Sequence, residues 1–484
     1  EVKANNVTIT GFTVRNSGVW LNSGIKLSNV KNCNLSENNI TSNSGDGISL
    51  YSSSNNTMSG NNITANNVNG ILFDSSSNNT ISGNNITAND SCGIRLGASS
   101  NNSITGNHVT NNYHGVRLVY HSNNNSITGN SITNNANGIW LDSSSNNNTI
   151  AENNIANNEN GIYLVYSSSN NRIVGNNITN NWNGVVFYYS SSNNHVIENN
   201  VTNNEYGIMI YFSSDNNTIA GNSIVANNWY GIMLLYSSNN SITGNNITAN
   251  NEDGILLDSS NNNSIAGNDI TNNLCGVWLD HSSNNNSITE NNVTNNVNGI
   301  WLSSSSDNCI IANNITANDW YGVRLSHSSN NSMVGNNITN NWYGIGLYTS
   351  SNNNSIARNN ITNNYYGIWL SYSSNNRIFQ NNFTDNTRQV YIVALGYANS
   401  WDDGYPSGGN YWSDYTDIDQ YSGPNQNETG SDRIWDHPYI IDENNKDNYP
   451  IVPEFPSLLF MPLFMIATLL GAIIYRRKKI HAIT

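Results

Sequence analysis

A glycine followed by isoleucine or valine returns about every 23 residues, and this repeat constrains the fold more than any other feature of the chain. The glycines concerned are Gly24, Gly47, Gly70, Gly93, Gly115, Gly138, Gly161, Gly184, Gly207, Gly231, Gly254, Gly276, Gly299, Gly322, Gly344 and Gly367. A fixed period in this range is typical of solenoids, in which each repeat contacts only its neighbours. The 484 residues therefore need not divide into several globular domains.

Apolar residues lie at fixed positions within every repeat. In the repeat that begins at Gly161 they are Ile162, Leu164, Ile173 and Ile178. The Ile-x-Leu alternation has the two-residue period of a strand, and the two later positions lie in short Thr- and Ile-rich segments. A helix is excluded because Asn and Gly interrupt the chain every few residues. Each repeat therefore predicts three short strands, and the array predicts a parallel β-helix with coils about 4.8 Å apart.

Pairs of asparagines return at equivalent turns of the predicted coils, as in Asn153-Asn154, Asn176-Asn177 and Asn199-Asn200. Stacked side-chain amides bond to their copies above and below when identical residues lie in register. We therefore expect asparagine ladders along the rod.

The composition narrows the possible partners. Charged residues make up only 10% of the chain, and the formal net charge is −15. Nucleic-acid binding needs clustered Lys and Arg, so a nucleic-acid partner is disfavoured. The four cysteines, Cys33, Cys92, Cys275 and Cys309, have no C-x-x-C spacing, and we interpret them as small buried hydrophobic residues.

The repeat motifs resemble those of a known family. Gly-Ile-x-Leu, Ser-Ser-Asn-Asn-x-Ile and Gly-Asn-Asn-Ile-Thr are similar to the right-handed parallel β-helix repeats of the pectin-lyase-like fold. More narrowly, they resemble the NosD-type repeat proteins, a family named for a periplasmic copper-maturation factor and abundant on archaeal surfaces. The resemblance covers roughly residues 5–394. It implies the fold, whereas proteins with such repeats differ in activity.

The sequence divides into three parts. Residues 1–394 are predicted to form the β-helix, with the cap that normally protects its N-terminal edge missing. Residues 395–452 are rich in Trp, Tyr, Asp and Gly, resemble the segment that follows archaeal NosD-type repeats, and are expected to cap the last coil. Residues 453–484 form a sorting and membrane segment.

That last segment predicts where the protein is found. Residues 458–475 carry no charge and are long enough for a transmembrane helix, and the basic residues 476–479 place the following tail in the cytoplasm. The rod would then lie outside the cell, anchored to the membrane. Residues 453–456, Pro-Glu-Phe-Pro, resemble the PEF-CTERM signals of archaea, which implies cleavage by an archaeosortase. A permanent single-span anchor is the alternative.

One column of residues, two positions after each repeat glycine, is predicted to face outward. It is apolar or aromatic over much of its length, and it supplies the candidate ligand-binding residues Trp140, Tyr163, Trp278, Trp301 and Trp369. Aromatic faces suit sugar rings, and large apolar patches mark binding surfaces. The alternative is cross-strand stacking that only stabilises the sheet.

Two aspartates are the candidates for catalysis. Asp258 and Asp280 lie four positions after glycines of adjacent coils, so their carboxylates are expected about 5 Å apart, the separation in a retaining glycosidase. The polygalacturonase-type paired Asp with His-Gly and Arg-x-Lys is absent, as is the Tyr-Gly-x-Asp-Pro-His motif of alginate epimerases. We therefore favour a like-charge pair on a ladder over catalysis.

Candidate metal ligands are sparse. His281 and His327 share a position but lie two coils apart without a nearby Met or Cys, which disfavours the copper site that the NosD resemblance suggests. In the predicted cap, Asp414, Asp417, Asp419 and Asp432 are the candidate ligands of a calcium site, with a solvated turn as the alternative.

Asn-Ile-Thr sequons recur with the repeat, and a subset of them is expected to carry glycans if the protein is exported. They begin at Asn39, Asn62, Asn85, Asn177, Asn246, Asn314, Asn337 and Asn360.

The preferred hypothesis is a non-catalytic, exported cell-surface β-helix that serves in adhesion, in the envelope or in binding extracellular glycans. A carbohydrate-active enzyme that uses the same face, of the polysaccharide-lyase or glycoside-hydrolase type, is one alternative. A NosD-like copper-binding or copper-maturation accessory protein is the other.

Overall fold

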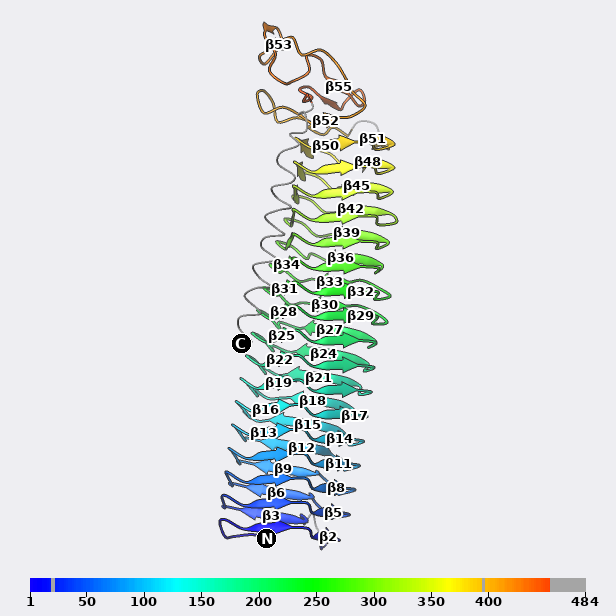
Figure 1. Cartoon of the computed structure of the whole chain (residues 1–484). Helices are drawn as coiled ribbons and strands as arrows, with labels where there is room; N and C mark the ends of the chain where they lie inside the picture. The colour runs from blue at the N-terminus through cyan, green and yellow to red at the C-terminus, as the bar shows by residue number, and fades with distance from the viewer. Residues whose placement is uncertain (19–21, 394–396, 453–484) are drawn as a thin grey trace, which may run out of the picture.

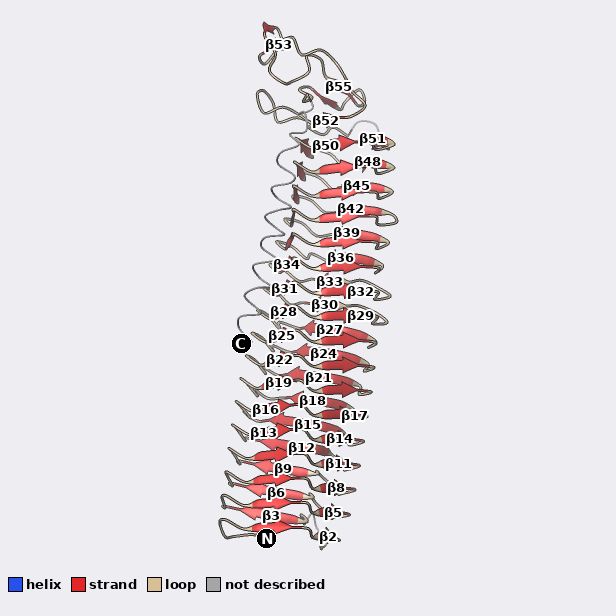
Figure 2. Cartoon of the chain, viewed as in Figure 1, coloured by secondary structure: helices blue, strands red, loops and turns tan. Residues whose placement is uncertain are grey.

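A computed structural model describes residues 1–18, 22–393 and 397–452. They form a right-handed parallel β-helix in which about 17 coils stack into one long rod (Figure 1). Strands alternate with tight turns along the whole rod, and no helix occurs among the described residues (Figure 2). The fold predicted from the 23-residue repeat is therefore confirmed.

Three parallel sheets run along the rod. Sheet B extends from β1 (Thr8–Thr10) to β49 (Arg377–Phe379), and sheet C from β2 (Thr13–Arg15) through β50 (Asn382–Thr384) to β52 (Tyr411–Trp412). Except for β52, each strand in these two sheets spans three residues.

Sheet A has the longest strands, of four to six residues. It consists of β3 (Ile25–Ser28), β6 (Ile48–Tyr51), β9 (Ile71–Asp74), β12 (Cys92–Gly97), β15 (His114–Val119), β18 (Asn137–Leu141), β21 (Asn160–Val165), β24 (Asn183–Tyr188), β27 (Tyr206–Tyr211), β30 (Ile232–Leu235), β33 (Ile255–Asp258), β36 (Cys275–Asp280), β39 (Asn298–Ser303), β42 (Tyr321–Ser326), β45 (Tyr343–Tyr348), β48 (Tyr366–Ser371) and β51 (Arg388–Ile392).

The predicted core positions are buried. In the coil made by β21, β22 (Arg172–Val174) and β23 (Asn177–Thr179), Ile162, Leu164, Ile173 and Ile178 have no solvent exposure. The register places each of these residues beside the equivalent residue of the next coil. Full burial of one such side chain contributes roughly 1.5–3 kcal/mol, so the stacked apolar columns are the main source of stability.

The repeat glycine is required by the close approach of successive coils. A Cβ atom added to Gly161 would lie 2.6 Å from the carbonyl oxygen of Gly184 and 2.9 Å from the side chain of Ile178. The same clash with the carbonyl oxygen of the next coil returns from Gly24 to Gly367, which explains why these coils keep glycine, whereas Gln389 takes the position in β51, the last strand of sheet A.

Asparagine ladders bind the coils together, as predicted from the Asn-Asn pairs. The first member of each pair is buried: both the backbone N–H and Nδ2 of Asn176 donate to Oδ1 of Asn199 in the next coil, each at 2.9 Å. Asn176 Nδ2 also donates to the carbonyl oxygen of Ile150. The second member lies at the surface, where Asn177 Nδ2 donates to Oδ1 of Asn154 at 2.9 Å.

Residues 397–452 pack onto the last coil. Trp412 stacks on Phe383 with ring centroids 4.4 Å apart, and Tyr439 stacks on Trp412 at 4.3 Å, so the rings continue a core column beyond the coils. The buried carboxylate of Asp447 accepts hydrogen bonds from the backbone N–H of Asn410 at 2.7 Å and from Trp412 Nε1 at 2.9 Å. Burial raises the pKa of Asp447 to about 7. This segment therefore covers the apolar end of the rod.

The predicted transmembrane helix at 458–475, the Pro-Glu-Phe-Pro sequence and the basic tail lie outside the described residues. Within the described part, no helix has the length and hydropathy needed to span a membrane.

Candidate functional site

The outer face of sheet A differs from the other two outer faces. We call the residues two positions after the repeat glycines the platform column. In register along the sheet it reads Lys26, Ser49, Leu72, Arg95, Arg117, Trp140, Tyr163, Val186, Met209, Met233, Leu256, Trp278, Trp301, Arg324, Gly346 and Trp369, and it ends at Tyr391, the equivalent residue of the last coil. The sequence prediction placed five ligand-binding residues here, and the structure brings them onto one face.

The five residues are half-buried, because neighbouring rings cover one another. Trp278 and Trp301 stack with centroids 5.0 Å apart and planes 12° from parallel, and Trp140 stacks on Tyr163 at 6.1 Å. The tryptophan faces are therefore directed along the rod against their neighbours. These contacts are compatible with ligand binding by the column and equally with a role that only stabilises the sheet.

More exposed aromatic rings stand on both flanks of sheet A. On the side before the glycines they are Tyr113, Trp182, Trp229, Trp320, Trp342 and Tyr365. On the other side they are Tyr120, Tyr166, Tyr189, Tyr236 and Tyr372. By contrast, the outward positions of sheets B and C are mostly Ser, Thr and Asn. Sheet A is therefore a broad aromatic face between two aromatic margins.

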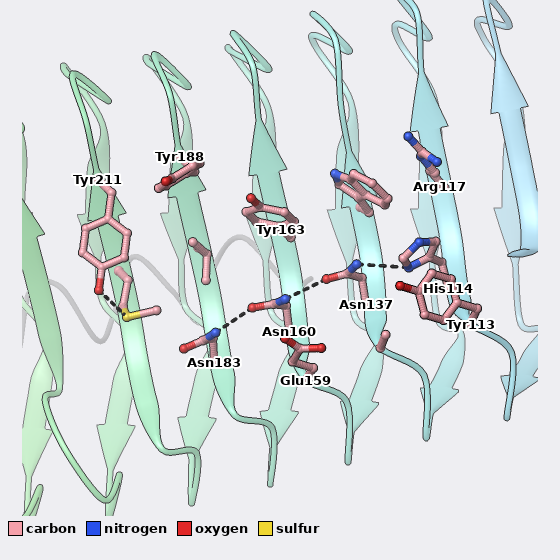
Figure 3. Close-up of a pocket in the computed structure, with 14 residues that line it drawn as sticks. Tyr113, His114, Arg117, Asn137, Glu159, Asn160, Tyr163, Asn183, Tyr188 and Tyr211 are labelled. Atoms are coloured by element: carbon pink, nitrogen blue, oxygen red, sulfur yellow. Dashed lines mark hydrogen bonds between the residues drawn. The ribbon is translucent and has the colours of Figure 1, made fainter. Parts of the chain in front are cut away.

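A depression of about 670 Å³ lies on this face, across β15 to β27 (Figure 3). Its aromatic lining is Tyr113, His114, Trp140, Tyr163, Tyr188 and Tyr211. Its polar lining includes Arg117, Glu159 and the amides of Asn137, Asn160 and Asn183, and Val186 and Met209 add apolar surface.

A chain of hydrogen bonds crosses the depression. Asn183 Nδ2 donates to Asn160 Oδ1 at 2.7 Å, and Asn160 Nδ2 donates to Asn137 Oδ1 at 2.7 Å. Asn137 Nδ2 lies 3.0 Å from Nδ1 of His114 (Figure 3). Because an amide N–H can only donate, His114 Nδ1 is the acceptor and the imidazole is neutral. Burial, and secondarily the charge of Arg117, lower the pKa of His114 to about 4.

The charges in the depression are unequal. The Arg117 guanidinium lies 3.8 Å from the centroid of the Trp140 ring and pairs with the buried Asp142 at 2.9 Å. Glu159 is exposed, and no described cation pairs with it. Burial raises the pKa of Tyr163 to about 12, so its hydroxyl is a neutral donor at physiological pH. The depression therefore offers rings, amides and one free carboxylate.

The sequence prediction missed His114, Arg117 and the asparagine chain. The signal was the column immediately before the repeat glycines, where Asn69, Cys92, His114, Asn137 and Asn160 succeed one another. Column-by-column comparison of adjacent coils would have found the hydrogen-bonding partners.

The candidate catalytic residues Asp258 and Asp280 both lie close to the imidazole of His281. His281 Nδ1 lies 3.4 Å from Asp258 Oδ1 and 3.1 Å from Asp280 Oδ2. The backbone N–H of His281 also donates to Asp280, and Ser259 donates to Asp258. The two carboxylates do lie on adjacent coils, β33 and β36, and each already has protein partners.

The cap aspartates do not converge. Asp417 accepts from the backbone N–H of His437 at 3.0 Å, whereas Asp419 accepts from Ser431 and from the backbone N–H of Asp432. Asp414 accepts from the Tyr439 hydroxyl. Among the described residues, no group of three or more His, Cys, Asp or Glu side chains is arranged to hold a metal ion. The calcium site stays a prediction.

The sequon asparagines lie on the outer face of sheet C. They belong to β5 (Asn39–Thr41), β8 (Asn62–Thr64), β11 (Asn85–Thr87), β23, β32 (Asn246–Thr248), β41 (Asn314–Thr316), β44 (Asn337–Thr339) and β47 (Asn360–Thr362). Several of their amides bond to one another, as where Asn337 Nδ2 donates to Asn314 Oδ1 at 2.8 Å. Glycosylation of a subset stays a prediction.

Two family models match the chain, one for the β-helix fold and one for a narrower family. Residues 2–155 match the model of the right-handed β-helix region, in agreement with the fold. Residues 166–298 and 282–417 match the NosD family, described as periplasmic copper-binding protein, and these overlapping matches cover just over half of the chain. The chain belongs to the NosD family.

Comparisons with individual proteins add little beyond the fold. The search of curated proteins finds no match. Among solved structures, the chain is similar to the periplasmic alginate epimerase AlgG (18% identity, TM-score 0.35, covering 61% of this chain and 76% of that one). It is also similar to the Azotobacter vinelandii mannuronan C-5 epimerase AlgE4 A-module (12% identity, TM-score 0.34, covering 74% of this chain and 91% of that one). A third similar structure is the Dettilon tailspike protein (16% identity, TM-score 0.37, covering 70% of this chain and 62% of that one).

The copper named in the family description can be tested against the residues present. Copper sites are built from converging His, Cys or Met side chains. His281 and His327 lie two coils apart, and the described residues contain no metal-holding cluster of His, Cys, Asp or Glu. Met209 and Met233 are neighbours, and both sulfur atoms lie near the Tyr211 hydroxyl. Thioethers are ligands that Cu(I) accepts, so the expectation that the protein has no copper site stays a prediction.

Proposed function

We propose that this protein is an exported rod at the cell surface that binds glycans on the outer face of sheet A without chemically changing them. The observation that carries this proposal is the depression across β15 to β27, where six aromatic rings surround a row of side-chain amides. Its volume falls in the range of small-ligand sites. Rings that contact the apolar faces of sugars, beside amides that bond to hydroxyl groups, suit a carbohydrate.

Export is supported by membership of a family that is described as periplasmic. We further propose that residues 458–475 anchor the rod in the membrane, unless an archaeosortase removes them after the Pro-Glu-Phe-Pro sequence. Mass spectrometry of the C-terminal peptide from native membranes tests this point. An intact C-terminus supports a permanent anchor, and a truncated one supports cleavage.

A glycan array tests the binding function. We expect the purified protein to bind a restricted set of glycans. For ligands that occupy the depression, Trp140→Ala or Tyr163→Ala should weaken binding roughly tenfold or more, because a central aromatic residue often contributes about 1–2 kcal/mol to the binding free energy. Trp278→Ala and Trp301→Ala test whether the stacked tryptophan pair of the platform column also binds glycans. Thr339→Ala on sheet C is the control, with unchanged binding. Absence of binding to every glycan would refute the proposal, and turnover of a polysaccharide would refute its non-catalytic part.

A further inference from the structure

Two arginines of the platform column stack on tryptophans, and among the described residues only one of them has a counter-ion. The guanidinium of Arg117 lies 3.8 Å from the Trp140 ring centroid, and that of Arg324 lies 4.4 Å from the Trp301 ring centroid. Arg117 pairs with Asp142 at 2.9 Å. For Arg324, the contacts in the described structure are all with aromatic rings, which include Tyr321 at 5.2 Å and Tyr348 at 5.3 Å.

The repeat explains this difference. Asp142 stands four positions after the glycine of the coil that follows Arg117, and the equivalent residue for Arg324 is Tyr348. Its hydroxyl is 2.8 Å from the hydroxyl of Tyr321. Burial raises the pKa of Tyr348, so the side chain stays neutral and cannot replace the missing carboxylate.

The backbone beside Arg324 is shaped for this arrangement. Gly346 is the residue in register with Arg324 on the next strand, and a Cβ atom there would lie 2.7 Å from the Tyr348 ring. Glycine therefore lets the Tyr348 ring lie over the platform column. The outcome is a guanidinium held between Trp301, Tyr321 and Tyr348 by aromatic contacts alone.

This arrangement leaves hydrogen-bonding capacity unused. A guanidinium has five N–H donors. In the described part of the chain, none of those of Arg324 meets a protein acceptor; its Nε is buried without a partner, as is the Nε of Arg117. The terminal N–H groups of Arg324 are open to solvent, where an oxyanion can accept paired charge-assisted hydrogen bonds from them.

We propose that Arg324 anchors a second glycan subsite, which takes the carboxylate or sulfate group of an acidic sugar. This inference rests on the proposed glycan-binding function of sheet A and names the chemical class of ligand at one end of it. The Trp301 ring lies against the guanidinium and stacks in turn on Trp278, and these two rings would contact the sugar itself. The depression around Trp140 has a free Glu159 instead, so the two subsites differ in charge.

Binding of charged and neutral forms of the same glycan tests the proposal. The full chain is titrated with polygalacturonate and its methyl ester, and with dextran sulfate and dextran. Because the chain carries a net charge of −15, general attraction does not favour the polyanions. We expect an acidic form to bind at least tenfold more tightly than its neutral partner, with the uronate and sulfate arms identifying the group.

Two variants locate the effect at Arg324, and a third is the control. We expect Arg324→Gln to remove the preference for the acidic form. Tyr348→Asp, which supplies the counter-ion that Arg117 already has, should remove it as well while the guanidinium stays in place. Arg172→Gln loses the same charge from the exposed face of sheet B, away from the aromatic face of sheet A, and should bind like the wild type. Thermal unfolding of each variant verifies that the rod is folded.

The outcomes separate this inference from the proposed function. Equal binding of acidic glycans by wild type and Arg324→Gln would overturn the inference and leave the proposed function intact, as would binding of neutral glycans alone. If no glycan binds the wild type, the proposed function fails and the inference with it.

Discussion

Sheets A and C belong to the same coils and close the same core, yet their outer faces follow opposite rules. On sheet C, the strand sequence Asn-Ile-Thr returns in coil after coil, and the asparagines bond to one another. On sheet A, the platform column changes from arginine to tryptophan to methionine while the flanking core residues stay Ile, Val or Leu, apart from Phe73 and Phe187. Repetition is needed where a side chain bonds to its own copy. Where the residue type is free to vary, the fold does not require it, and the position is available for a ligand.

The largest expected difference in stability lies between substitutions of the buried and the surface member of one Asn-Asn pair. Asn176→Ala removes the acceptor of Asn153 N–H and Nδ2 and the donor to Asn199, and it leaves buried polar groups unpaired. At about 1–3 kcal/mol for each unpaired group, we expect a loss of roughly 3–5 kcal/mol in the free energy of unfolding. Asn177→Ala, at the surface, should cost only about 0.5–1 kcal/mol. Denaturant unfolding measures both, and equal losses would contradict the distinction between buried and surface ladders.

The next effect concerns pH and sheet A. The pKa of His114 is about 4 in the folded protein against 6.5 for a free imidazole, so the unfolded chain takes up a proton at a pH where the folded chain does not. The contribution of the neutral His114 to the free energy of unfolding is complete above pH 6.5, and up to about 3 kcal/mol of it is lost as the pH falls towards 4. His114→Asn, which copies Asn137, should remove this acid sensitivity. Unfolding curves between pH 7 and 4 measure the difference, and parallel curves for both proteins would disprove it.

A smaller difference in stability is expected between substitutions of the two arginines that stack on tryptophans. Arg117→Gln leaves the buried carboxylate of Asp142 without its ion pair, and we expect it to destabilise the protein by about 1–3 kcal/mol. Arg324 has no such partner in the described part of the chain, so Arg324→Gln should change stability by less than about 0.5 kcal/mol. Melting temperatures of the two variants, measured side by side, test this order. A larger loss for Arg324→Gln would mean that the aromatic contacts alone stabilise the rod.

Most of the fold could be predicted because each residue of the repeat has one neighbour above and one below. The spacing from Gly161 to Ile162, Leu164, Ile173 and Ile178 gives the strands, the register and the core together. The paired asparagines gave the ladders in the same way. Residues 397–452 do not repeat, so the stacking of Tyr439 on Trp412 could not be derived from a period.

The site could be predicted only in part. The platform tryptophans were found because they share a column, but the exposure of a ring depends on how its neighbours tilt over it, and Trp278 and Trp301 cover each other. The pairing of Arg117 with Asp142 joins different columns of adjacent coils, so a comparison within single columns does not reveal it. The same reason hid the missing counter-ion of Arg324.

The buried ladders also give the rod a direction of hydrogen bonding. In each Asn–Asn ladder bond, Nδ2 donates to Oδ1 of the next coil, so every ladder carbonyl faces the N-terminal side. Asn410 accepts the last of these bonds from Asn381 Nδ2 and donates its own backbone N–H to the carboxyl group of Asp447. The carboxyl group of Asp447 thus accepts the final bond of this column. The segment that covers the last coil therefore satisfies the end of a buried polar ladder as well as covering the apolar core.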